Sequence, residues 1–136
     1  MFANSCTSRS NEQITALNRL VGVWEGSYVA NQGETGLTLD VYMDGGHCRA
    51  IFDFYNLPGK TNAKEGKYVM RVSYNTSTQQ YYLRGHTWVE RPDNYRFVDL
   101  EGTITGDDFS GSVVGLATFR VARRQGLLPE RGPFGK

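Results

Sequence analysis

The stretch LVGVWEGSY, residues 20–28, marks the point where the hydrophobic period of this chain changes. Before it, a serine at position 10 that can cap a helix is followed by Ile14, Leu17 and Val21 at helical spacing. After it, apolar and polar residues alternate, as is typical of strands with one buried face. The sequence therefore predicts a short helix over residues 10–21 and a first strand over residues 22–30.

Seven further runs with strand-like alternation follow, each bounded by turn residues. They cover residues 37–43, 48–56, 67–74, 80–89, 95–104, 109–114 and 117–123. Short links between successive strands favour an all-β fold, an eight-stranded up-and-down antiparallel β-barrel with a short N-terminal helix; a sandwich of the same strands is the alternative. The first, third and fifth links are longer than the second, fourth and sixth. One end of the barrel is therefore expected to be closed by tight turns, and the other to form a mouth.

Length and composition bound the class of protein. The chain has 136 residues, of which 39% are hydrophobic, and a net charge of +1. These values predict one barrel domain over residues 10–124, a flexible N-terminus over 1–9 and a disordered tail over 125–136. Neither a nucleic-acid polymer nor a membrane is expected as a partner, because the net charge is small and no apolar run approaches roughly 20 residues. With no signal-peptide pattern, a soluble cytoplasmic protein is expected.

A Gly-x-Trp sequence, Gly22-Val23-Trp24, opens the first strand directly after the helix, and Arg123 ends the last strand. In these features the chain resembles the calycin superfamily of lipocalins, avidins and fatty-acid-binding proteins. The resemblance implies that Trp24 plugs the closed end of the barrel and that Arg123 packs over it.

The residues that usually carry catalysis do not form a convincing group. Cys48 follows His47 in a strand, so the two side chains point to opposite faces. Two histidines and two cysteines are too few and too scattered for a metal centre. We expect no catalytic residues, no metal and no cofactor, and two free thiols, Cys6 and Cys48; a disulfide between them is the alternative.

Aromatic residues near the predicted mouth suggest a binding site instead. Tyr28, Phe54 and Tyr68 fall on the inward phase of their strands, and so does Arg96 at the start of the sixth. An arginine among aromatic rings suits an anionic, planar ligand, because guanidinium pairs with phosphate or carboxylate and rings stack on bases. The sequence thus predicts a non-enzymatic barrel that binds a nucleotide-like small molecule.

Two orientations of the fifth strand remain open. If Arg84, His86 and Trp88 point inward, they join the ligand site; Leu83 and Val89 favour the opposite orientation. If Trp88 points outward, it extends an apolar patch on the outer face of strands two to five. The other members of that patch are Tyr42, Ile51, Tyr55, Val69 and Tyr82. Such a patch predicts a homo-oligomer or a protein partner for a side-chain-filled barrel. A barrel cyclase or isomerase is a third alternative.

Overall fold

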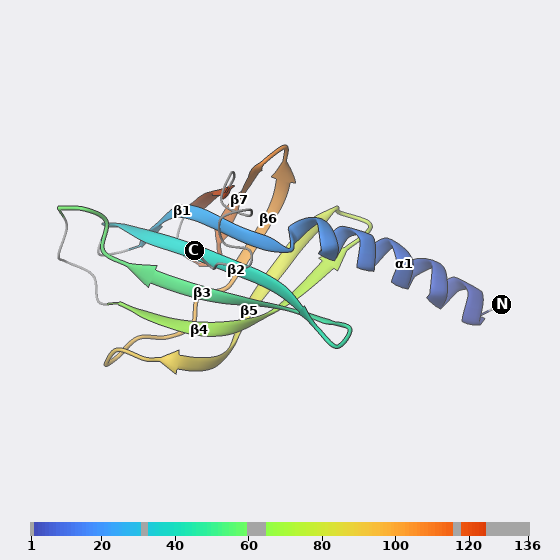
Figure 1. The fold of residues 1–136 in the computed structure, drawn as a ribbon, viewed down its shortest axis with the longest axis horizontal. Helices are drawn as coiled ribbons and strands as arrows, with labels where there is room; N and C mark the ends of the chain where they lie inside the picture. Colours follow the sequence, from blue (N-terminus) through green and yellow to red (C-terminus); the bar gives the residue numbers. More distant parts are fainter. Residues whose placement is uncertain (1, 31–32, 60–64, 116–117, 125–136) are drawn as a thin grey trace, which may run out of the picture.

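The computed structural model describes residues 2–30, 33–59, 65–115 and 118–124, with side chains in the helix described from Asn11 onward. A helix, α1 (Phe2–Leu20), leads into eight strands (Figure 1). The strands are β1 (Gly22–Ala30), β2 (Gly33–Asp44), β3 (His47–Tyr55), β4 (Gly66–Asn75), β5 (Gln80–Glu90), β6 (Leu100–Thr105), β7 (Asp108–Val113) and β8 (Thr118–Arg123). Within this part of the chain, no helix is both long enough and apolar enough to cross a membrane.

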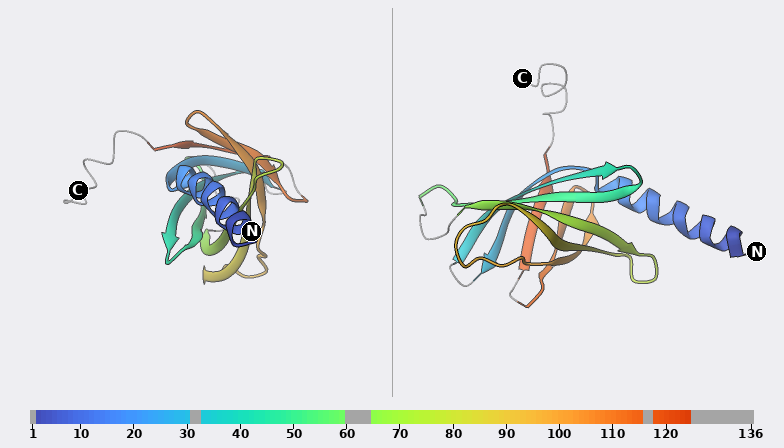
Figure 2. Two further views of the ribbon diagram at one scale, coloured as in Figure 1. Left: turned by 90° about the vertical axis from the view of Figure 1, so that its right-hand side faces the viewer. Right: turned by 90° about the horizontal axis from the view of Figure 1, so that it is seen from below.

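Each strand pairs antiparallel with its neighbour in the sequence, and β1 pairs with β8 to close the barrel. The predicted fold class, an eight-stranded up-and-down antiparallel barrel with an N-terminal helix, is confirmed. The helix lies at the end of the barrel that carries the β2–β3 and β4–β5 turns, which we call the closed end (Figures 1 and 2). The opposite end, where β3 leads towards β4 and β5 towards β6, is the mouth.

Several predicted boundaries were wrong. The helix begins at Phe2 rather than at residue 10, and β2 begins at Gly33 rather than at residue 37, so the first link is short. Residues 95–99 are not part of β6, which begins at Leu100. Side chains explain this last difference. The Tyr68 hydroxyl binds the backbone of Val98, and the Asp99 carboxylate accepts from the backbone N–H of Gly85. The predicted tail, residues 125–136, lies outside the described residues.

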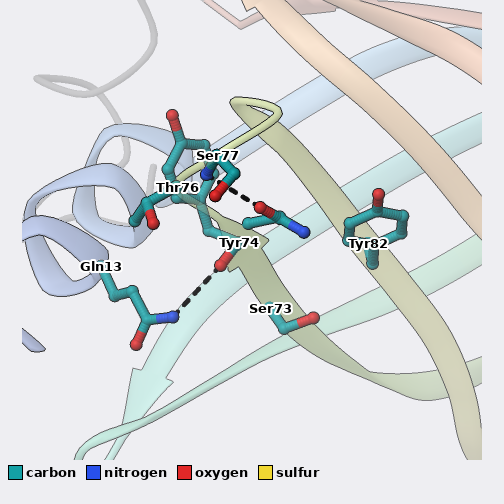
Figure 3. Close-up of a pocket in the computed structure, with 7 residues that line it drawn as sticks. Gln13, Ser73, Tyr74, Thr76, Ser77 and Tyr82 are labelled. Atoms are coloured by element: carbon teal, nitrogen blue, oxygen red, sulfur yellow. Dashed lines mark hydrogen bonds between the residues drawn. The ribbon is translucent and has the colours of Figure 1, made fainter. Parts of the chain in front are cut away.

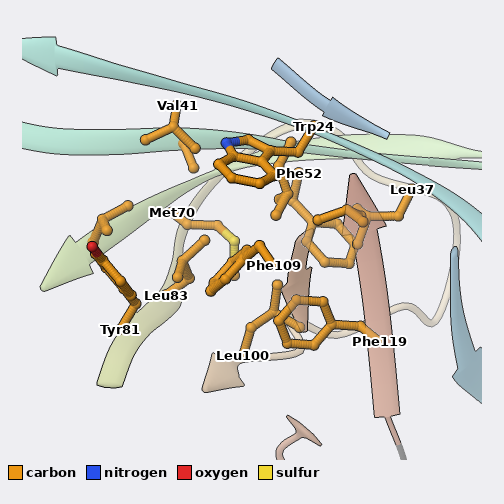
Figure 4. Packing of buried hydrophobic residues seen from close by; sticks show 14 of the residues in the cluster. Trp24, Leu37, Val41, Phe52, Met70, Tyr81, Leu83, Leu100, Phe109 and Phe119 are labelled. Atoms are coloured by element: carbon orange, nitrogen blue, oxygen red, sulfur yellow. The ribbon is translucent and has the colours of Figure 1, made fainter. Parts of the chain in front are cut away.

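The interior of the barrel is filled by the inward side chains of its strands. Trp24 and Phe109 meet edge to face with ring centroids 5.9 Å apart, and Phe109 meets Phe119 at 5.1 Å (Figure 4). Towards the mouth, Phe52 stacks on Tyr68 at 4.8 Å. Alternating residues of β3, from Cys48 to Phe54, are all buried, as the apolar phase predicts. Such packing stabilises the fold through apolar burial, at roughly 25 cal/mol per Å².

Strand β5 changes face part of the way along its length. Its pairing with β4 matches Met70 to Gly85 but Val69 to Thr87, so His86 is an extra residue in a β-bulge. A second irregularity follows between Trp88 and Glu90. Because the bulge shifts the alternation by one residue, Leu83 and Trp88 both point inward. Neither of the two orientations predicted for the whole strand is therefore correct.

Candidate functional site at the mouth of the barrel

The barrel wall is incomplete in its sheet bonding near the mouth. Strand β5 pairs with β6 only from Tyr81 to Leu83, whereas its pairing with β4 continues to Glu90. Residues 91–99, which we call the mouth strap, run from the end of β5 to the start of β6 without strand structure. On the side that faces β6, the mouth half of β5 therefore has no ladder, and the strap follows it instead.

Tyr68 of β4 fixes the strap. Its hydroxyl donates to the carbonyl oxygen of Val98 at 2.8 Å and accepts from the N–H of Val98 at 2.9 Å. Burial raises the pKa of Tyr68 well above its usual range, so the hydroxyl keeps the proton that it donates. One buried side chain thus satisfies both backbone groups of a residue that has no ladder partner.

Two aromatic rings of the strap stack on rings of the barrel. Phe97 lies on Trp88 with centroids 5.1 Å apart and 13° between the planes. Tyr95 lies on Phe54 at 5.5 Å and 5°. Gly85 leaves the room that Phe97 needs, since a Cβ at position 85 would lie 2.3 Å from the Phe97 Cγ.

Positive charge lies beside these rings but outside the barrel. The Arg91 guanidinium carbon is 5.7 Å from the centre of the Trp88 ring, and its Nε donates to the carbonyl of Tyr95 at 3.1 Å. Arg96 is exposed. The prediction that Arg96 points inward was wrong, because its segment is not a strand and does not follow strand alternation.

The other predicted ligand residues divide between the interior and the surface. Tyr28, Phe54 and Tyr68 are buried at the mouth half of the barrel, where Tyr28 meets Phe52 at 5.5 Å. Trp88 is half-buried and lies against Tyr68 at 4.8 Å. Arg84 and His86 are exposed on the outer face, away from these rings. The strap rings of Tyr95 and Phe97 were missed, although the aromatic content of residues 95–97 was visible in the sequence.

At the closed end, the structure brings Trp24 and Arg123 together. Trp24 is fully buried, and the Arg123 guanidinium lies over its ring at 4.2 Å from the centroid. Arg123 Nη2 donates to the carbonyl of Arg19 at 2.7 Å and Nη1 to that of Val21 at 3.1 Å. Arg123 therefore joins β8 to a carbonyl of the last turn of α1 and to the carbonyl of Val21 just after the helix, where a cation is favourable.

Most of the predicted outer patch lies on the outer face of β2–β5, but it is smaller than expected. Tyr42, Ile51, Tyr55, Val69 and Tyr82 are each half-buried. Ile51 pairs directly with Val69 across β3 and β4. The Tyr55 ring covers Gly36, and its hydroxyl lies 2.9 Å from the Thr38 hydroxyl. Trp88 does not belong to the patch because the His86 bulge turns it inward.

A polar depression of about 400 Å³ lies at the closed end, between α1 and the β4–β5 turn (Figure 3). Gln13 Nε2 donates to the carbonyl of Tyr74 at 3.2 Å, and the Asn75 carboxamide oxygen accepts from the N–H of Ser77 at 2.8 Å. Polar groups that line the depression are thus engaged in hydrogen bonds that hold the helix and the turn in place. The depression is therefore explained by local structure and is remote from the mouth.

Cys48 is a buried free thiol, and burial raises its pKa to about 11, which makes it a poor nucleophile at neutral pH. The side chain of Cys6 lies outside the described residues. Among the side chains that are described, no three His, Cys, Asp or Glu residues converge as metal ligands.

Comparison of the chain with models of protein families, with curated proteins and with solved structures found no match.

Proposed function

We propose that this chain is a non-enzymatic binding protein that takes a small anionic, aromatic ligand of nucleotide type at the mouth of its barrel. The observation that carries the proposal is the pair of strap rings, Phe97 stacked on Trp88 and Tyr95 stacked on Phe54, both on a segment that has no strand structure. The calycin-like shape, in which ligands enter at one end of a closed barrel, is consistent with it.

The strap rings occupy positions that an aromatic ligand would take. Both stacks are near parallel, which is the geometry in which a nucleobase stacks on an aromatic side chain. A ligand that displaces Phe97 from Trp88 replaces one stacking contact with another. Because the interior is otherwise filled, we place the ligand in the space of the strap rings rather than deeper in the barrel.

Charge near the strap supports an anionic ligand. Arg91 lies over Trp88, and Arg96 is exposed on the same short segment. Guanidinium groups bind phosphate or carboxylate oxygens through paired hydrogen bonds. In this proposal, Arg91 and Arg96 hold the anionic part of the ligand while Trp88 and Phe54 hold its ring.

Tryptophan fluorescence tests the proposal directly, because the chain has two tryptophans and they lie at opposite ends of the barrel. Nucleotides and cyclic dinucleotides are titrated against the wild type and against Trp88→Phe. We expect a saturable change in the wild type that is lost in Trp88→Phe and weakened by Arg96→Ala. Arg120→Ala, which removes the same charge from the outer face of β8, should bind normally. The proposal is rejected if no nucleotide of the panel gives a saturable fluorescence change and isothermal calorimetry detects no binding either.

A further inference from the structure

Three arginines stand side by side on the outer face of the barrel. Arg49 of β3 pairs directly with Arg71 of β4, and Arg71 pairs directly with Arg84 of β5. We call these residues the arginine row. Since neighbouring strands lie about 4.8 Å apart, the row places three guanidinium side chains on a line roughly 10 Å long at its base.

By itself, this arrangement lowers the stability of the folded protein. Like charges directly opposite each other on adjacent strands destabilise a sheet, and an arginine side chain cannot lose its proton to relieve the repulsion. The net charge of the whole chain is only +1, so the row is a local concentration of charge rather than part of a basic protein.

Within the described part of the chain, no carboxylate neutralises the row. Among the described residues, no acidic oxygen lies within 4.0 Å of Arg49, Arg71 or Arg84. The arginines on the β1, β7 and β8 side of the barrel are different. Arg120 pairs with Asp108 at 2.9 Å, Arg123 with Asp107 at 3.6 Å, and Arg124 with Glu25. One side of the barrel thus pairs its arginines with acids, whereas the other carries three adjacent arginines that have no acidic partner among the described residues.

The β-bulge of β5 adds a fourth nitrogen group to the row. His86 is the extra residue of the bulge, and its Nε2 lies 3.5 Å from Arg71 Nη2. Bulges of this kind redirect a side chain at the cost of ladder bonds, and they are frequent beside functional sites. Here His86, the extra residue of the bulge, has its imidazole against the central arginine of the row.

We propose that the arginine row is a binding site for an anion that carries several phosphoryl groups in line. Guanidinium groups present N–H donors in a fork that matches phosphate oxygens, and a row of them suits a linear series of phosphates. Tyr42, which pairs with Arg49 from β2, bounds the row at one end. The site lies on the outer wall, is separate from the mouth, and does not depend on the ligand proposed there.

Calorimetric titration of the full chain with inorganic tripolyphosphate at low salt tests this site. We expect saturable binding that weakens with added salt and falls about tenfold in Arg71→Gln, since the central guanidinium contributes charge-assisted hydrogen bonds. The matched control is Arg120→Gln, which removes the same charge from an exposed arginine on the opposite side of the barrel. Trp88→Phe, which alters the proposed ligand site at the mouth, should bind tripolyphosphate as the wild type does.

A parallel titration with oligothymidylate distinguishes free polyphosphate from the sugar-linked phosphates of a nucleic-acid strand as the ligand. Binding of either anion that is sensitive to Arg71→Gln and insensitive to Arg120→Gln supports the site, and the tighter anion tells whether free or sugar-linked phosphates are its ligand. Absence of binding to both, or an equal loss in Arg120→Gln, overturns the proposal. So does self-association that Arg71→Gln abolishes without any anion binding, because the row would then be an interface between copies.

Discussion

The hydroxyl of Tyr68 binds both backbone polar groups of Val98, with the oxygen 2.8 Å from the carbonyl oxygen and 2.9 Å from the amide nitrogen. A side chain of β4 thereby takes the place of a strand partner for the mouth strap. The backbone of Val98 is consequently bonded by a side-chain group rather than by a continuous ladder.

Tyr68→Phe should loosen the strap and lower the free energy of unfolding by roughly 1–3 kcal/mol, because Val98 loses both partners in a half-buried place. Urea denaturation measures the loss, and amide exchange at Val98 should become faster. Tyr82→Phe is the control, since among the described residues its hydroxyl bonds to the nearby Gln80 side chain alone, at 3.3 Å. Equal exchange rates at Val98 in the wild type and Tyr68→Phe would show that the strap is held by its rings instead.

Gly85→Ala should destabilise the protein by roughly 1–3 kcal/mol, because the new Cβ would lie 2.3 Å from the Phe97 Cγ and force this ring off its place. The two sites should be coupled. In a Phe97→Ala background the same change should cost at least about 1 kcal/mol less, which a double-mutant cycle measures. Strict additivity of the two substitutions would contradict the packing of Phe97 over Gly85.

Arg123→Lys should cost roughly 1–2 kcal/mol of stability, although it keeps the charge. The lysine ammonium cannot reproduce the separate bonds to the carbonyls of Arg19 and Val21 while lying over Trp24. Arg120→Lys, at a side chain that is 74% exposed, should change stability little. Thermal denaturation followed by circular dichroism compares the two variants. A smaller loss of stability in Arg123→Lys than in Arg120→Lys would contradict the prediction.

The sequence was sufficient to predict the barrel, because alternation and turn residues are local signals that recur in every strand. Tyr28, Phe54 and Tyr68 were placed inward correctly by the same period. Arg96 was misplaced because its segment looks like a strand locally, yet a distant tyrosine and the Asp99 carboxylate take the bonds that a ladder would use. Trp88 was ambiguous because Leu83 and Trp88 fall on opposite phases of the strand, and only the pairing with β4 reveals the bulge at His86 that turns both inward. The arginine row was not predicted, because it depends on the register between β3, β4 and β5, which the alternation within each strand leaves open.

Arg71→Thr should stabilise the free protein by about 0.2–1 kcal/mol at low salt, because it removes the central member of three adjacent like charges and introduces a good strand former. The gain should shrink as salt screens the repulsion. Denaturation at two salt concentrations measures it. A destabilised variant would mean that Arg71 makes favourable contacts on the free surface, and the repulsion argument for the arginine row would then lose its basis.

Stability should fall in alkaline solution between pH 9 and 12. Burial raises the pKa of Tyr28 from 10.0 to about 12 and that of Cys48 from 9.0 to about 11. Above the ordinary pKa of each group, the unfolded chain loses a proton that the folded chain keeps, so rising pH favours unfolding. Below the ordinary pKa, both states hold the proton and the stability is not reduced. For Tyr28 the loss reaches roughly 2 kcal/mol by pH 12. Urea denaturation at pH 8, 10 and 11 should show a shallower decline in Tyr28→Phe and in Cys48→Ala than in the wild type. Parallel curves for all three proteins would mean that neither buried group titrates with the unfolding transition.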